Sequence, residues 1–128
     1  MKLRIKGSSL RLRLTQGEIQ QLVETGEVQE QVRFAASATL VYRLRRDSKI
    51  SDITATYTVN LIEILIPERA SREWCGSDRV TLEHSQRVPG GELRVTLEKD
   101  FACLAPRAGE DESDNFPHPQ AVTGSPKC

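Results

Sequence analysis

Positively charged side chains alternate with leucine and isoleucine near the start of the chain. The cations are Lys2, Arg4, Lys6, Arg11 and Arg13, and Gly7-Ser8-Ser9 separates the two runs. A period of two predicts a hairpin whose cations all project from one face. Because like charges on adjacent strands repel, such a face is favoured when an anion lies on it. We therefore expect Lys2, Arg4, Arg11 and Arg13 to donate hydrogen bonds to a phosphate or carboxylate group.

A second interpretation of the same face needs no small ligand. Its charges could pair with Glu27, Glu30, Glu63 or the acidic residues near the C-terminus. Charged outer faces also keep sheet edges from pairing with other chains. The partner that the sequence predicts is thus an anionic small molecule or an acidic protein surface, and a solvated face paired within the chain is the alternative to both.

If the strands close into a barrel, the charged side chains of the same alternating runs would instead point into its interior. A polar interior would then gain further charged residues: Arg33, Arg43, Arg45, Glu63, Glu83, Arg94 and Glu98. Such an interior predicts an enzyme acting on a phosphorylated or carboxylated small molecule. The pattern is similar to the polyphosphate-binding tunnels of the triphosphate tunnel metalloenzymes, but the first strand lacks the paired glutamates of that family. A non-catalytic binding module is therefore our main hypothesis, and the enzyme is the alternative.

Cysteine and histidine are too widely spaced to predict a metal site or a catalytic thiol. The residues considered are Cys75, His84, Cys103, His118 and Cys128. Structural zinc sites use pairs of ligands roughly two to four residues apart, and no such pair occurs here. A nucleophilic thiol would need a motif that places it beside an imidazole. We expect no metal, no cofactor and no catalytic residue.

The elements that position these residues follow from periodicity. After the hairpin over 2–14, strands are predicted at 27–34, 39–46, 53–59 and 61–66, through Val80 and Leu82, and through Leu93 and Leu97. Thr15 and Glu18 have the spacing of a capping box, and Gly26 suits a left-handed C-terminal position, so we expect a helix over 16–25. Pro67 favours a second, short helix over 67–74.

These elements predict an α+β fold with a mainly antiparallel sheet of about eight strands, because short connections exclude most parallel crossovers. Whether the sheet stays open or curls into a barrel is not determined by the sequence. No internal repeat of roughly 20 to 50 residues is evident. We expect one domain over 1–105, followed by a Pro-rich acidic tail over 106–128 that docks in part through Phe116.

Charge is balanced over the chain but not along it. The 128 residues hold 18 Lys plus Arg and 18 Asp plus Glu, which excludes a histone-like protein and an acidic disordered protein. Residues 1–46 carry a balance of +5, and residues 47–128 carry −5. A locally cationic face is therefore compatible with zero net charge.

Compartment and partners are constrained mainly by what the sequence lacks. No apolar run is long enough for a signal peptide or a membrane span, and three cysteines are an odd number for a disulfide framework. We expect a soluble cytoplasmic protein that does not bind membranes. With two Tyr, three Phe and one Trp, stacking platforms for nucleic acid are lacking. A homodimer in which an exposed sheet edge or the Pro-rich tail exchanges between copies is a further option.

Two segments carry a family resemblance. The first is Lys2-Leu3-Arg4-Ile5-Lys6-Gly7 with Ser9-Leu10-Arg11-Leu12-Arg13-Leu14-Thr15, and the second is Glu98-Lys99-Asp100-Phe101-Ala102-Cys103-Leu104 with Glu110-Asp111-Glu112-Ser113-Asp114 and Phe116-Pro117. They resemble a bacterial family of short uncharacterised proteins, a domain of unknown function, and the resemblance extends over essentially the whole chain. It implies no activity, cofactor or site residue.

Overall fold

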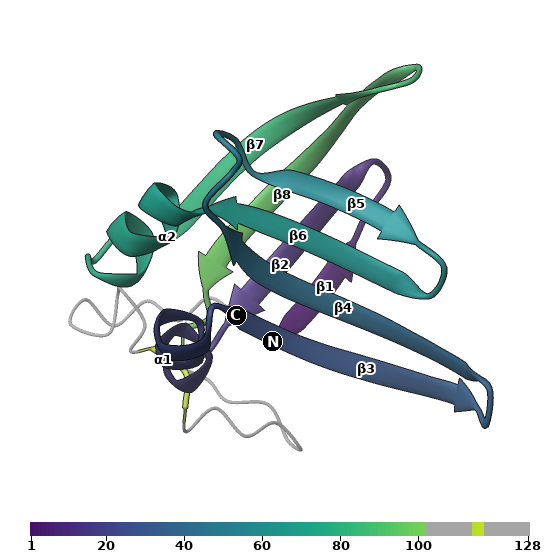
Figure 1. Ribbon diagram of the computed structural model, residues 1–128, viewed down its shortest axis with the longest axis horizontal. Helices are drawn as coiled ribbons and strands as arrows, with labels where there is room; N and C mark the ends of the chain where they lie inside the picture. Colours follow the sequence, from purple (N-terminus) through teal and green to yellow (C-terminus); the bar gives the residue numbers. More distant parts are fainter. Residues whose placement is uncertain (102–113, 117–128) are drawn as a thin grey trace, which may run out of the picture.

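The computed structural model describes residues 1–101 and 114–116. Within them lie eight strands and two helices (Figure 1). In chain order these are β1 (Lys2–Ile5), β2 (Ser9–Leu14), α1 (Gln16–Thr25), β3 (Glu27–Ala35), β4 (Ala38–Asp47), β5 (Thr54–Thr58), β6 (Leu61–Pro67), α2 (Glu68–Cys75), β7 (Thr81–Val88) and β8 (Gly91–Lys99). Each element predicted from periodicity is present, and β7 extends well beyond the two apolar residues that predicted it.

Helix α1 begins and ends where the sequence predicts. The Thr15 hydroxyl accepts a hydrogen bond from the Glu18 backbone N–H, and the Glu18 carboxylate accepts one from the Thr15 N–H. This reciprocal pair is a complete capping box. Gly26 has a φ of 82°, and its N–H donates to the Leu22 carbonyl, which ends the helix in a left-handed residue. Buried Ile19 and Leu22 anchor the helix in the core.

The strands form two four-stranded sheets. Sheet A has the order β1-β2-β8-β7, and sheet B has the order β3-β4-β6-β5. Each sheet is mixed, because β2 pairs with β8 in parallel and β4 pairs with β6 in parallel. The prediction of one mainly antiparallel sheet is therefore wrong in these details. It considered only short connections, whereas each parallel pair joins strands that other elements separate along the chain.

The two sheets are built from one repeated unit. A hairpin, a helix and a second hairpin occur first as β1-β2-α1-β3-β4 and again as β5-β6-α2-β7-β8. Each sheet combines the first hairpin of one unit with the second hairpin of the other. The register repeats as well, since the pair Lys2 and Arg13 corresponds to Thr54 and Leu65. The sequence showed no such repeat, because equivalent positions differ in side-chain type.

The core lies between the inner faces of the sheets and extends to both helices. Leu12 and Leu97 of sheet A pair in register, as do Leu44 and Ile64 of sheet B, and all four are buried. Trp74 of α2 is fully buried, and its indole N–H donates to the Val80 carbonyl over 3.0 Å. Further residues of the core cluster are Leu14, Ile19, Leu22, Val28, Ala55, Ile66, Leu82 and Val95. The inner faces are therefore apolar near the helices.

No closed barrel forms from the described strands. One gap between the sheets, from β5 to β7, is bridged by the side chain of Gln86, which accepts from the Ala55 N–H at 2.7 Å and donates to the Ala55 carbonyl at 2.9 Å. The other gap, from β1 to β3, is bridged at Met1. Its amino group contacts the carboxylates of Glu18 and Glu30, and its carbonyl accepts from the Tyr42 hydroxyl.

Candidate functional site

The cations of the first hairpin lie on the outer face of sheet A. Arg4 and Arg11 are direct cross-strand partners, as are Lys2 and Arg13. Their neighbours on the inner face, such as Leu12, are buried in the core. The alternation of charged and apolar residues thus separates the two faces, because successive side chains of a strand point to opposite sides.

Two of the four predicted binding residues have a close acidic partner. The Lys2 ammonium lies 3.2 Å from Asp100, and the Arg13 guanidinium lies 2.6 Å from Glu98. Both acids come from the end of β8 or just after it. The part of the face nearest the helices is therefore neutralised within the chain, but not by Glu27, Glu30 or Glu63, which the second interpretation named and which pair with Met1, Arg43 and Arg45 instead.

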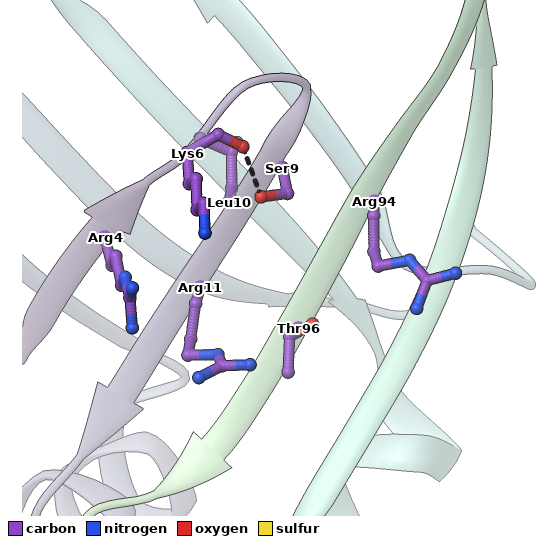
Figure 2. A pocket seen from close by; sticks show the side chains of 7 residues that line it. All are labelled: Arg4, Lys6, Ser9, Leu10, Arg11, Arg94 and Thr96. Carbon is purple, nitrogen blue, oxygen red and sulfur yellow. Dashed lines mark hydrogen bonds between the residues drawn. The ribbon is translucent and has the colours of Figure 1, made fainter.

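The other two, Arg4 and Arg11, line a hollow of about 220 Å³ farther along the same face. We call it the cationic hollow, and its lining residues are Arg4, Lys6, Ser9, Leu10, Arg11, Arg94 and Thr96. Figure 2 shows the side chains of Arg4, Arg11 and Arg94 on the same side of three adjacent strands. Four cations, Arg4, Lys6, Arg11 and Arg94, thus line this one space.

Charge in the cationic hollow is poorly compensated. Among the residues that the structure describes, only Arg11 of the four cations has an acid within ion-pair distance, Glu98 at 4.0 Å. Glu98 is shared with Arg13, which it contacts much more closely. Arg4 and Arg11 stand directly opposite each other, an arrangement that destabilises a sheet unless an anion screens it.

Two hydroxyl groups complete the lining. The Ser9 hydroxyl donates to the Lys6 carbonyl over 2.6 Å, which ties the turn to the start of β2. Thr96 is only 5% exposed and sits on β8 as the register partner of Arg11. The hollow can therefore offer guanidinium and ammonium donors to one bound group.

Comparison with known proteins identifies the family of this chain. A model of a family of unknown function (DUF7009) matches residues 1–120. The chain belongs to DUF7009. No curated protein and no solved structure matches it. In the described part of this DUF7009 chain, no helix has the length and apolar character needed to span a membrane.

The sequence of this DUF7009 chain predicted only two of the four cations that line the hollow, Arg4 and Arg11. Lys6 was part of the alternating run but was not among the predicted binding residues, and Arg94 and Thr96 belong to a strand distant in sequence. Arg94 alternates with Leu93 and Val95, so the sequence predicts that its side chain lies on the outer face of a strand. The sequence does not predict which residues lie next to Arg94, because the parallel pairing of β2 with β8 brings it beside Ser9.

The outer face of sheet B is different. Glu63 of β6 contacts the Arg43 and Arg45 guanidiniums of β4 at 2.7 Å and 3.3 Å. Burial of Glu63 opposes its ionisation, but hydrogen bonds and charge from Arg45 and Arg43 outweigh burial and hold the pKa of Glu63 below its ordinary value. This face therefore neutralises its own cations.

The cysteine and histidine residues do not assemble within the described part of the DUF7009 chain. No group of His, Cys, Asp and Glu there has the geometry of a metal site. Cys75 ends α2 and His84 lies on β7, and Cys103, His118 and Cys128 lie outside the described residues. Burial raises the pKa of the Cys75 thiol, which disfavours the thiolate that nucleophilic catalysis needs.

Part of the predicted tail lies against the body of the molecule. The Phe116 N–H donates to the Asp100 carbonyl over 2.7 Å, and its ring lies 5.6 Å from that of Phe101. The Asp114 carboxylate accepts from the Gly17 N–H at the start of α1. Asp114 therefore meets a helix N-terminus, where a negative charge is stabilised, while Glu110, Asp111 and Glu112 lie outside the described residues.

Proposed function

We propose that this protein is a non-catalytic binding module that holds a phosphate-type anion in the cationic hollow. The observation that supports it is that Arg4, Arg11 and Arg94 of three adjacent strands and Lys6 beside the first turn all line one small space. Arginine presents several donors in a planar fork that matches a phosphate, and such charge-assisted hydrogen bonds are among the strong ones.

The ligand we infer carries at least two negative charges. Four cations with a single shared acid leave a local excess that one monovalent anion would not balance. The hollow, at about 220 Å³, is smaller than the roughly 300 Å³ at which pockets for drug-sized ligands begin. It therefore suits one or two phosphate groups, either free or at the end of a larger molecule that extends into solvent.

Binding is favoured over catalysis by the residue types present. None of the seven lining residues is Asp, Glu, His or Cys, so the hollow lacks a side chain suited to general base catalysis near neutral pH. The Ser9 hydroxyl is already engaged with the Lys6 carbonyl. The alternative enzyme needed charged side chains inside a barrel, whereas the inner faces near the helices carry leucine, isoleucine and valine.

Calorimetric titration with inorganic pyrophosphate at low salt tests the proposal. We expect saturable binding that weakens as salt is added, since part of the hollow is open to solvent. Arg4→Gln and Arg94→Gln should each weaken binding about tenfold, because each removes a charged donor that contributes about 1.5 kcal/mol or more. Arg69→Gln removes an equally charged side chain from exposed α2 and should leave binding unchanged.

The proposal fails if pyrophosphate does not bind, or if Arg69→Gln weakens binding as much as Arg4→Gln does. The second result would mean that pyrophosphate responds only to the overall charge of the protein. Circular dichroism of each variant verifies that the fold is retained.

A further inference from the structure

Exposed apolar side chains gather at one end of the molecule. Of the six large hydrophobic residues that are exposed in the described part of the chain, five lie in or beside hairpin turns: Ile5, Val32, Phe34, Tyr57 and Val59. Figure 1 shows the turns of all four hairpins at the end opposite α1 and α2. We call this the hairpin end. The sixth, Val23, lies on α1.

The β3–β4 hairpin is the most exposed part of the hairpin end. Every residue from 29 to 38 is exposed, and its tip reads Phe34-Ala35-Ala36-Ser37-Ala38. Hairpin turns usually carry glycine, asparagine or aspartate, which readily adopt the backbone conformations that tight turns need. Here a 72% exposed phenylalanine stands beside three alanines, and Arg33 is the neighbouring charge. A second surface that covered this tip would remove the apolar area from water.

The hairpin end also offers a surface that could receive such a tip. Ile5 pairs with Leu10 and Tyr57 pairs with Ile62, so both exposed residues share the inner, apolar faces of their sheets. Half-buried Leu10 and Leu93 pack against the core from the same side. The apolar lining of the core thus continues toward the hairpin end.

The two gaps between the sheets differ in how their edge strands are bridged. Between β5 and β7, the amide of Gln86 occupies both backbone groups of Ala55. The equivalent of Gln86 in the first unit is Val32, as the register pairs Gln86 with Leu93 and Val32 with Leu40 show. Valine cannot form these hydrogen bonds, so among the described strands β3 is an edge strand there, with an apolar side chain on it.

We propose that the hairpin end is the interface of a homodimer, in which the β3–β4 tip of one protomer packs against the inner apolar faces of the other. A twofold interface requires one patch to carry both the protruding and the receiving surface, and this end carries both. Segments 5–8, 29–38, 57–60 and 87–92 together hold 24 residues, within the roughly 20 to 30 residues per side of a stable interface. Charges of both signs lie at this end, with Arg33 at the β3–β4 tip and Glu92 opposite Arg87 in the β7–β8 hairpin.

Mass measurement by light scattering during size exclusion, under reducing conditions, tests the proposal on the full chain. We expect twice the 14.3 kDa mass of one chain at micromolar concentration, and the monomer mass for Phe34→Lys and Val59→Lys. Val23→Lys places the same charge on an exposed apolar position of α1 and should leave the dimer intact. Both hairpin positions are exposed, so these changes leave folding undisturbed, which circular dichroism verifies.

Photo-crosslinking from a benzophenone side chain at position 34 identifies the occupant. Mixed light and heavy isotope chains should yield cross-links between copies to peptides containing Ile5 or Tyr57. A monomeric wild type at high micromolar concentration overturns the proposal, as does a Phe34→Lys dimer. Cross-links to α1 or α2, or binding of the monomer to phospholipid vesicles through Phe34, would also overturn it. A pyrophosphate titration of Phe34→Lys shows whether the cationic hollow still binds its ligand when the dimer is lost, so the two proposals are tested separately.

Discussion

The outer faces of the two sheets occupy equivalent positions but differ in chemistry. Across β1, β2 and β8 of sheet A, one row reads Arg4, Arg11, Thr96. The equivalent row across β5, β6 and β4 of sheet B reads Thr56, Glu63, Arg43. The first row holds two adjacent cations, and the second places an acid between a hydroxyl and a cation.

The next row toward the turns sharpens the contrast. In sheet A it contains Ser9 and Arg94, with Lys6 beside the turn. In sheet B the equivalent pair is Leu61 and Val41. Charged and hydroxyl groups therefore line the cationic hollow where sheet B has aliphatic side chains. One backbone arrangement thus supports a charged, open face and a neutralised face, and only the side chains distinguish them.

The gaps between the sheets form a second comparison, and the largest expected effect concerns them. Gln86→Val places in the second unit the residue that the first unit has. The change leaves the buried Ala55 N–H without a partner, which we expect to lower the free energy of unfolding by about 2 kcal/mol. Urea denaturation measures the loss, provided that the slope of the transition is unchanged.

Gln31→Val is the matched control for Gln86→Val, since Gln31 is an exposed glutamine on the corresponding edge strand β3. Its free energy of unfolding should stay within about 0.5 kcal/mol of the wild-type value. Equal losses in the two variants would contradict a specific role for the Gln86 amide.

A smaller effect is expected on sheet B. Glu63→Gln removes the charge that Arg43 and Arg45 share, and should lower the free energy of unfolding by about 1 kcal/mol at neutral pH. In the unfolded chain Glu63 regains its ordinary pKa of 4.5, whereas in the folded protein its pKa is lower. The stabilisation is therefore complete above 4.5 and is lost as pH falls through the folded value.

Denaturation at a series of pH values measures this linkage. The gap between wild type and Glu63→Gln should be constant near neutrality and should close in acid. A gap that widens as pH falls would show that Glu63 is not held in its ionised form.

The smallest effect tests the repulsion within sheet A. Arg4→Thr introduces the residue type that sheet B has at this position, Thr56. We expect the ligand-free protein to gain about 0.5 kcal/mol of stability, because Arg4 no longer opposes Arg11. Thermal unfolding at low and high salt measures the gain, which should shrink as salt screens the charges. A loss of stability at low salt would mean that these cations do not repel each other.

The sequence largely predicted the local structure. The capping box of Thr15 and Glu18 and the left-handed Gly26 are interactions between near neighbours, so their residue types predict the helix directly. Alternation in β1, β2 and β8 likewise identifies which side chains face the core and which face solvent. Neither kind of pattern contains information about which strands lie side by side.

The candidate site shows the consequence. Arg4 and Arg11 were predicted together because a tight turn joins their strands, whereas Arg94 is brought to them by a pairing across the whole chain. Lys2 and Arg13 were predicted equally, yet Asp100 and Glu98 engage them. Which cations keep their charge available depends on those distant acids, and the sequence does not reveal their positions.

The sequence by itself determined the helices, the strands, the separation of charged and apolar faces, and the cationic character of the first hairpin. These follow from local sterics and from the burial of one face of each element. The tertiary structure alone decided the two mixed sheets, the repeated unit, the cationic hollow and the open edge of β3. They depend on contacts between residues far apart in the chain, which are selected by the packing of the whole core rather than by any local pattern.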